Sequence, residues 1–233
     1  MDGRIEITRS KKRGKRIELT LSDGDSIKVL EESVFKHGLF TERSFSPEQW
    51  VEILTDAWEA EAHQRMMDLL ARRPHTRKEM CRKLYKREFA PDIIDRVTKR
   101  AEELGILNDR VFADLFVDEK ITVAGWGERK IRTELAKRGV EKQIIQDAFE
   151  KLDQRHGEEV VWLHACQLAE KKWKILKGED NIYKKKQKLL QYLSGRGFDA
   201  ASCYKLYDHC AGRDSDSEDF LHVEEEGAEW PIF

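Results

Sequence analysis

The chain has 233 residues, of which 38% are charged and 39% hydrophobic, and its formal net charge is −2. This balance supplies too little apolar surface for one thick core and suits thin, modular helical layers. So small a net charge argues neither for nor against binding to nucleic acid, so the distribution of the charges matters more.

Nothing in the composition indicates a membrane or an oxidising compartment. No apolar run is long enough to span a bilayer, and residues 1–16 lack the apolar core of a secretory signal. The four cysteines form no Cys-x-x-Cys pair. We therefore expect a protein of a reducing cytosol without a membrane span.

The N-terminal segment is expected to form β-structure. Apolar and polar residues alternate in residues 4–10 and 15–30, which predicts three short strands. Asp23-Gly24 predicts a tight hairpin turn, because glycine accepts a positive φ at no steric cost. A short helix that ends at Gly38 follows the strands.

A helix over residues 47–72 is expected to connect this sheet to the rest of the chain. Ser46 has the type and position of an N-cap residue, and Pro47 and Gln49 complete the pattern of a capped first turn. Apolar residues then continue at helical spacing.

The rest of the chain repeats itself. Residues 77–101 align without gaps with residues 128–152, and residues 185–210 follow as a third copy. Six columns of this alignment are apolar in all three copies: Met80/Ile131/Leu189, Leu84/Leu135/Leu193, Phe89/Val140/Phe198, Ile94/Ile145/Cys203, Val97/Ala148/Leu206 and Ala101/Leu152/Cys210. Such a register predicts tandem units of three helices each.

The predicted fold class is mostly α, with tandem three-helix units in an elongated arrangement behind a small N-terminal antiparallel hairpin or sheet. The leading helices of the units are expected at 60–72, 109–121 and 158–176. The predicted boundaries are 1–45 for the β-containing segment, 46–108 for the connecting helix and first unit, 109–155 for the second unit, 156–212 for the third unit, and 213–233 for an acidic tail expected to be disordered.

Turn residues mark the junctions within the units. Gly139 and Gly197 occupy the same place before the third helix, where a left-handed C-cap favours glycine. Glu88 fills that place in the first unit, so we expect a different cap there. Asp109 is expected at the N-terminal end of a helix, where its carboxylate can accept backbone N–H groups. Trp126, between two glycines, marks a break between helices and serves either as an interface anchor or as a cap on its own unit.

Basic side chains cluster in the first two units. With Arg82 and Lys86 four residues apart, and Lys83 and Arg87 likewise, a helix would group them beside its apolar face. This pattern predicts either a surface for an acidic protein groove or for DNA phosphates, or an ordinary solvated face. The predicted basic surface comprises Arg72, Arg73, Arg77, Lys78, Arg82, Lys83, Lys86, Arg87, Arg129, Lys130, Arg132, Lys137 and Arg138.

Three further charged segments each have two possible roles. Residues 9–16, RSKKRGKR, form a hairpin tip or loop that either touches DNA or keeps a sheet edge soluble. Residues 183–188, YKKKQK, are similar. The tail, residues 213–233, either solubilises the chain or docks as an autoinhibitory segment.

Metal binding and catalysis find little support. His164 with Cys166, and Cys203 with His209 and Cys210, are candidates for zinc, but Cys203 and Cys210 fall in apolar core columns. The chain contains neither a phosphate-binding Gly-rich loop nor a Gly-x-Ser-x-Gly motif. We therefore expect no metal, no cofactor and no catalytic residues.

Three segments resemble the RecX family of bacterial regulatory proteins. They are RRPHTRKE (72–79), LNDRVFA (107–113) and the stretch from Gly127 to Val140. The resemblance implies a non-enzymatic modulator, built of tandem three-helix units, that binds along the RecA–DNA filament and restrains strand exchange, ATP hydrolysis and coprotease activity. Met80 and Glu88 depart from the family pattern, in which Leu and Gly are commoner.

The first functional hypothesis is therefore a monomeric inhibitor of the RecA recombinase, whose basic surface contacts the filament protein, single- or double-stranded DNA, or both. The alternative is a helical module that binds DNA or RNA without an obligate protein partner. An enzyme is a third and weaker hypothesis, because thin helical layers offer few pockets.

Overall fold

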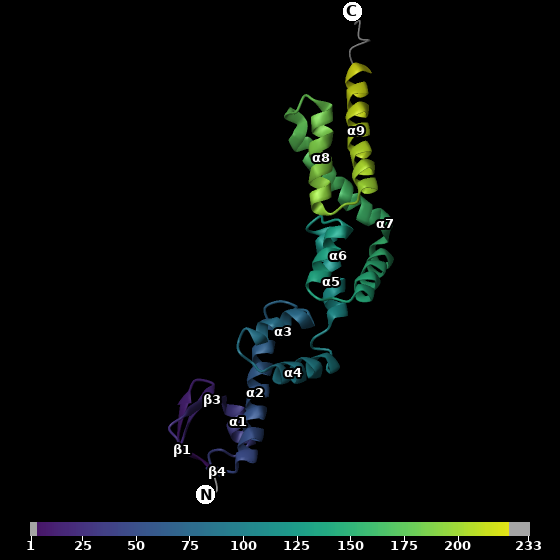
Figure 1. The fold of residues 1–233 in the computed structure, drawn as a ribbon. Coiled ribbons are helices and arrows are strands. Elements are labelled where there is room, and N and C mark those ends of the chain that lie inside the picture. Colours follow the sequence, from purple (N-terminus) through teal and green to yellow (C-terminus); the bar gives the residue numbers. More distant parts are fainter. Residues whose placement is uncertain (1–3, 224–233) are drawn as a thin grey trace, which may run out of the picture. The chain divides into compact units, whose positions relative to one another are not determined.

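The computed structural model describes residues 4–223, with side chains as far as Gly212, and the chain divides into two units, Met1–Asp109 and Arg110–Phe233. A small antiparallel sheet is followed by three tandem three-helix bundles (Figure 1). The predicted class, mostly α with three-helix units behind a small sheet, is confirmed.

The sheet has one strand more than the sequence pattern indicates. Its order is β3-β2-β1-β4, with β1 over Ile5–Arg13, β2 over Arg16–Leu21, β3 over Ser26–Leu30 and β4 over Ser44–Phe45. Gly24 has a φ of 93°, which confirms the predicted turn between β2 and β3. The hairpin tip expected within residues 9–16 is confirmed, but it is short, since β1 continues to Arg13 and only two residues form the turn.

One helix supports both the sheet and the first bundle. α2 (Pro47–Leu70) begins with the predicted capping box, in which Ser46 accepts from the Gln49 N–H and the Gln49 side chain accepts from the Ser46 N–H. The buried face of its first half, with Trp50 and Ile53, shares a core with β1, β2, β3 and the short helix α1 (Glu31–Lys36). Its second half, with Met66, enters the core of the first bundle.

The first bundle is completed by α3 (Arg77–Tyr85) and α4 (Pro91–Glu103). Thr76 caps α3 by accepting from the Glu79 N–H at 3.2 Å. Asp109 lies at the start of α5, as predicted, and its carboxylate accepts the Arg77 N–H at 2.8 Å. The N-terminal turn of α3 is therefore satisfied from two sides.

The second unit of the chain holds two bundles that share α7. The second bundle consists of α5 (Asp109–Thr122), α6 (Glu128–Lys137) and the first part of α7 (Lys142–Ile175). Gly157 interrupts α7 with φ 73° and ψ 151°, a conformation that is essentially restricted to glycine. The leading helix of the third unit therefore starts after Gly157, as predicted.

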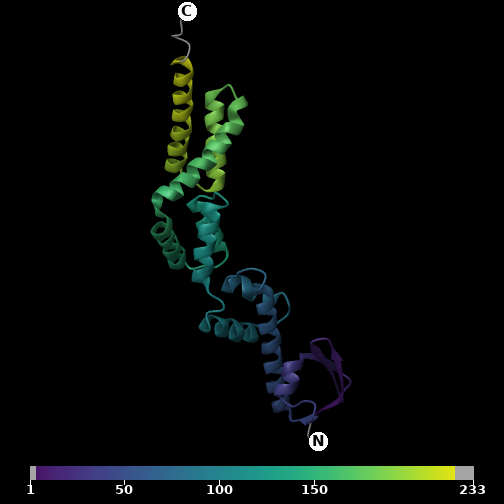
Figure 2. The same ribbon diagram turned by 180° about the vertical axis from the view of Figure 1, so that it is seen from behind.

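The third bundle contains the second part of α7, α8 (Ile182–Arg196) and α9 (Ala200–Val223), which lie side by side in Figure 2. A short 3₁₀ turn over Leu176–Gly178 leads from α7 to α8. The backbone of α9 extends into the expected tail. Residues 224–233 lie outside the described residues, so the disorder of residues 213–233 stays a prediction.

The six apolar columns form the cores of the three bundles. Seventeen of their eighteen side chains are buried, and Phe198 is partly buried against the same core. Gly139 and Gly197 have φ values of 85° and 94°, as expected for left-handed caps. The expectation of a different cap at Glu88 is wrong, because Glu88 adopts the same conformation with φ 66°.

A close backbone contact joins the second and third bundles. The N–H groups of Gly127 and Arg129 at the start of α6 donate to the carbonyls of Arg196 and Gly197 at 2.9 and 3.1 Å. A Cβ on Gly127 would lie less than 3.0 Å from backbone atoms of Gly197 and Phe198. Glycine is therefore required at position 127 by proximity alone, since its φ of −79° suits any residue.

Among the described residues, no helix combines the length and apolar composition needed to cross a lipid bilayer.

Candidate interaction surfaces

The basic residues predicted in the first unit differ in whether they form ion pairs within the protein. Five of them form a group that we call the α3 cation cluster: Lys78, Arg82, Lys83, Lys86 and Arg87. In the part of the chain that the structure describes, none of the five makes an ion pair. Four of the five are exposed and Lys83 is half-buried. Four of the five, all but Lys78, lie in or just after the last turn of α3, where cations interact favourably with the helix dipole.

The other basic residues of this unit support the structure. Arg73 pairs with the buried Glu79 at 3.0 Å. Arg77 reaches from α3 to Asp95 at 2.8 Å and Glu102 at 3.0 Å, and so ties α3 to α4. Arg72 is exposed. Among the predicted residues of this unit, the cation cluster and Arg72 are thus the ones that make no ion pair within the described part of the chain.

An aromatic side chain lies within the cation cluster. Tyr85 is 67% exposed and lines a shallow groove of about 380 Å³ together with Arg82, Pro91 and Ile94. Exposed tyrosine beside arginine is typical of interface anchors, because both supply large contact area at modest entropic cost.

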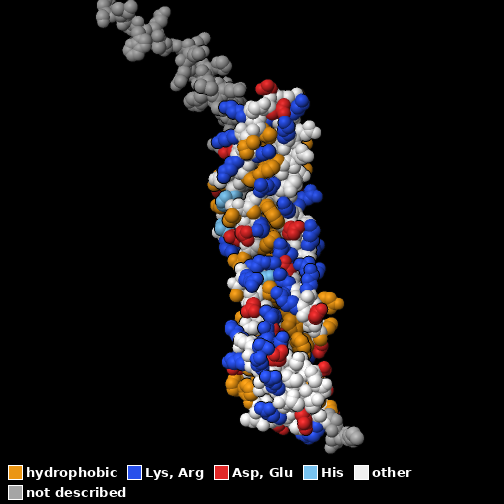
Figure 3. All heavy atoms as spheres, turned by 90° about the vertical axis from the view of Figure 1, so that its left-hand side faces the viewer, with side chains coloured by type: hydrophobic (Ala, Val, Ile, Leu, Met, Phe, Trp, Pro, Cys, Tyr) orange, Lys and Arg blue, Asp and Glu red, His pale blue; other side chains and the backbone are white. Residues whose placement is uncertain are grey.

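The basic residues predicted in the second unit are mostly engaged within it. Arg132 pairs with Glu128 at 2.6 Å, and Lys137 pairs with Glu134 at 3.0 Å. The guanidinium carbon of Arg138 lies 5.2 Å from the centre of the Phe116 ring. Arg129 is exposed. Figure 3 shows Lys and Arg side chains interspersed with acidic and hydrophobic ones on the face it presents.

Trp126 belongs to its own bundle. Its ring lies edge-on to Phe116 at a centroid distance of 6.3 Å and packs against the core of the second bundle. The ammonium groups of Lys120 and Lys130 lie 5.5 and 4.2 Å from the centre of its ring. The capping interpretation is therefore confirmed, and the half-buried side chain also lines the cleft described below.

Further basic residues lie on β1 and α8. Arg9 and Lys11 on β1 are exposed, whereas Lys12 pairs with Glu31 at 2.7 Å. The lysines of residues 183–188 lie in the first turns of α8, where Lys185 approaches the Trp173 ring to 3.8 Å from its centre. The α8 lysines are thus partly used in packing the third bundle.

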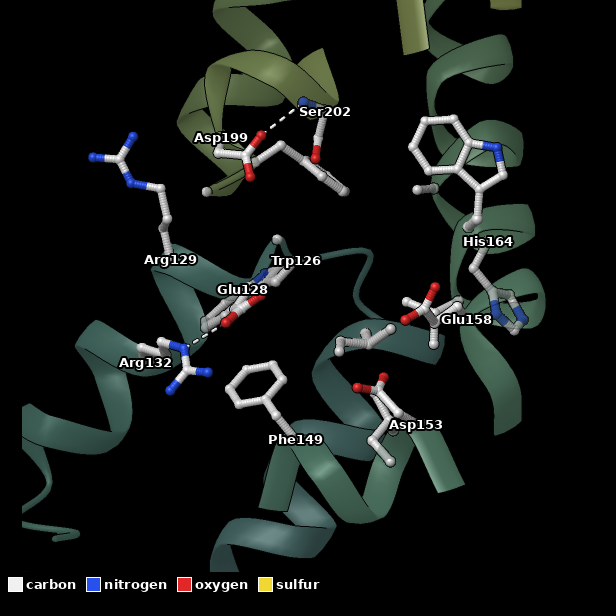
Figure 4. A pocket seen from close by; sticks show the side chains of 18 of the residues that line it. Trp126, Glu128, Arg129, Arg132, Phe149, Asp153, Glu158, His164, Asp199 and Ser202 are labelled. Atoms are coloured by element: carbon white, nitrogen blue, oxygen red, sulfur yellow. Dashed lines mark hydrogen bonds and ion pairs between the residues drawn. The ribbon is translucent and has the colours of Figure 1, made fainter. Parts of the chain in front are cut away.

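A cleft of about 650 Å³ opens between the second and third bundles (Figure 4). Trp126, Phe149 and Trp162 contribute aromatic walls. Asp153 and Glu158 lie on opposite sides of the Gly157 break, and Figure 4 places them across the cleft from Trp126.

Negative charge in the cleft is only partly compensated. Glu128 is paired with Arg132, and Asp199 accepts the Ser202 N–H at 2.6 Å. Asp153 and Glu158 have no ion-pair or hydrogen-bond partner among the described residues. Burial, followed by the charges of Glu158, Glu128 and Glu150, raises the pKa of Asp153 above its usual value. Arg129 also lines the cleft, but acidic side chains outnumber basic ones there, so the local charge favours a cation.

The zinc candidates have other roles. Cys203 and Cys210 lie in the core of the third bundle with Cys166, and His209 contacts Glu170 at 2.8 Å. No three His, Cys, Asp or Glu side chains converge on a metal position in the described chain.

The cleft was missed from the sequence. Asp153 and Glu158 are ordinary charged residues in a charged chain, and only the break at Gly157 and the contact of Gly127 with Gly197 bring the cleft walls together. A glycine inside an otherwise helical run, at position 157, was the one local signal.

Tandem three-helix bundles behind a small sheet define a helical repeat protein, a class that acts through its surfaces. Models of the first, second and third three-helix domains of RecX match residues 62–100, 108–148 and 158–206. The chain belongs to the RecX family of regulatory proteins, which is not a family of enzymes.

Curated relatives match most of their own length. The chain is 34% identical over 155 residues to the regulatory protein RecX of Chlorobium phaeobacteroides (strain BS1), covering 66% of this chain and 97% of the relative. It is 28% identical over 196 residues to that of Clostridioides difficile (strain 630), covering 83% and 89%.

Solved structures share the fold. A crystal structure of regulatory protein RecX aligns with a TM-score of 0.64 at 22% identity, covering 88% of this chain and 99% of that one. RecX from Lactobacillus salivarius aligns with a TM-score of 0.57 at 21% identity, covering 66% and 97%. At these identities the likeness shows the fold alone.

Proposed function

We propose that this chain binds the RecA–single-stranded DNA filament in the bacterial cytoplasm and inhibits its recombinase, ATPase and coprotease activities. Through these it modulates recombination, repair and the SOS response. Membership of the RecX family supports the class of partner. The observation that carries the proposal is the α3 cation cluster, whose five side chains make no ion pair within the described residues and whose Arg82 lines a groove with the exposed Tyr85.

The cluster suits an acidic protein surface or phosphates. Exposed cations without an ion pair lose no internal interaction when they bind a partner. Residues such as Arg132 must first break an existing ion pair, which costs binding free energy. Several tandem bundles also allow several weak contacts, which together raise the effective concentration of each.

The test is single-stranded-DNA-dependent ATP hydrolysis by the RecA of the same organism, titrated with this protein while DNA is in excess. Inhibition well below the RecA concentration, unchanged by further DNA, supports filament binding. Inhibition that added DNA relieves favours the second candidate, a DNA- or RNA-binding module, which the exposed cations of β1 also support.

Charge reversal tests the cluster itself. Replacing Arg82, Lys83, Lys86 and Arg87 with glutamate is expected to abolish inhibition without loss of helical content, because these side chains make no ion pair in the described structure. A matched control replaces four exposed lysines outside the cluster, Lys142, Lys171, Lys174 and Lys177, for the same change in net charge. Full inhibition by the cluster variant, or equal loss in both variants, would remove the cluster from the mechanism.

A further inference from the structure

We propose that the cleft between the second and third bundles binds an arginine or lysine side chain on an extended segment of the protein partner. The inference rests on the proposed function for the identity of that partner, the RecA filament. It assigns to the chain a second interaction site, opposite in charge to the α3 cation cluster.

The charge of the cleft selects a cation. Asp153 and Glu158 project from the two sides of the Gly157 break and have no partner in the described part of the chain. Both residues are exposed, and partial burial of the Asp153 carboxyl together with neighbouring carboxylates raises its pKa, in keeping with the excess of negative charge. A bound ammonium or guanidinium would relieve both carboxylates with charge-assisted hydrogen bonds.

The walls of the cleft select a side chain rather than a bare ion. Trp126, Phe149 and Trp162 offer ring faces and edges to an aliphatic stem and to a cation. A volume of about 650 Å³ accommodates a long side chain together with the backbone that carries it.

Other occupants fit less well. Nucleic acid is disfavoured, because its phosphates would meet Asp153 and Glu158, and Arg132, one of the two arginines that line the cleft, is already paired with Glu128. Residues 213–233 of this chain are rich in aspartate and glutamate, so like charge disfavours them as well. The basic residues of a second copy share the favoured chemistry, and the experiment separates that source from the partner.

The first experiment is independent of RecA. N-acetyl-arginine amide is titrated into the full chain, and the indole N–H signals of Trp126 and Trp162 are followed by NMR. We expect saturable shifts of both signals, lost in the double variant Asp153→Asn with Glu158→Gln, and no such shifts with N-acetyl-glutamate amide. Absence of these shifts overturns the cleft proposal and leaves the proposed function standing.

The second experiment measures the affinity of each protein for RecA filaments on single-stranded DNA. The double variant is expected to bind about tenfold more weakly, since a cation held in the cleft would lose both of its charge partners. Its resistance to urea should equal or exceed that of the unaltered chain, because carboxylate repulsion is removed. The matched control is Asp180→Asn with Asp208→Asn, two exposed carboxylates of the same unit that lie outside the cleft.

A photo-crosslinking residue at position 162 identifies the occupant. Crosslinking in filament mixtures to a RecA peptide that contains arginine or lysine supports the proposal. Crosslinking only to DNA or to a second copy of this chain overturns it, as does unchanged filament affinity of the double variant. If the unaltered chain does not bind filaments at all, the proposed function fails, and the arginine titration alone decides whether the cleft binds the side chain.

Discussion

Substituting alanine at three glycines separates close backbone approach from backbone strain. Gly127 has an ordinary φ of −79° but touches the backbone of Gly197 and Phe198. Gly105 has a φ of 70° but its Cβ would meet nothing within 4 Å. Gly197 combines both conditions, with a φ of 94° and a Cβ that would overlap Lys130.

The expected costs follow from these geometries. Gly105→Ala should lower the free energy of unfolding by about 1 kcal/mol, because alanine is disfavoured in a left-handed conformation. Gly127→Ala should cost about 2–3 kcal/mol, because the bundles must separate and strain the hydrogen bonds to Arg196 and Gly197. Gly197→Ala should cost about 3–4 kcal/mol, since strain adds to the overlap.

Urea denaturation of the full chain gives the free energies of unfolding, and native-state hydrogen exchange of the residue 127 and Arg129 amides reports on the contact itself. We expect both amides to exchange faster in Gly127→Ala and Gly197→Ala than in Gly105→Ala. A Gly127→Ala variant that is as stable as the original, with unchanged protection of these amides, would refute the close contact between α6 and α8.

Two further predictions concern the first unit. Glu88→Gly should raise the free energy of unfolding by about 1 kcal/mol, because Glu88 occupies a left-handed cap at φ 66°; a thermal melt that does not rise would contradict the cap. Burial, followed by the charge of Arg73, lowers the pKa of the His75 side chain. Only the unfolded chain then takes up a proton as pH falls through about 6.5, so stability should fall between pH 7.5 and 5.5. His75→Gln should flatten that part of the urea-midpoint profile against pH, and an unaltered profile would exclude His75 as its cause.

The repeat could be predicted because it depends on local pattern. Columns such as Met80/Ile131/Leu189 are apolar in every copy, and each proves fully buried. The capping box at Ser46 was equally local, since its two hydrogen bonds join residues three apart.

The predictions that failed concerned contacts between residues far apart in the sequence, or residues that are unusual for their position. β4 has two residues, and its pairing with β1 joins parts of the chain far apart in sequence. The position of Glu88 has a left-handed conformation that favours glycine, so a glutamate there predicted a different cap from the one that the structure shows. Likewise, the sequence shows where the basic residues are, but it does not show which of them form ion pairs. Arg77 and Arg132 are examples of residues whose acidic partners could not be predicted.

The continuity of α2 means that the repeats visible in the sequence are not the pieces into which the molecule can be cut. Trp50 and Ile53 need the sheet to cover them, and Met66 on the same helix needs α3 and α4. A fragment that begins at the first repeat would expose the sheet-facing half of that helix or lose its cap at Ser46. Expression of isolated parts should therefore respect the helix, with residues 1–109 kept as one piece.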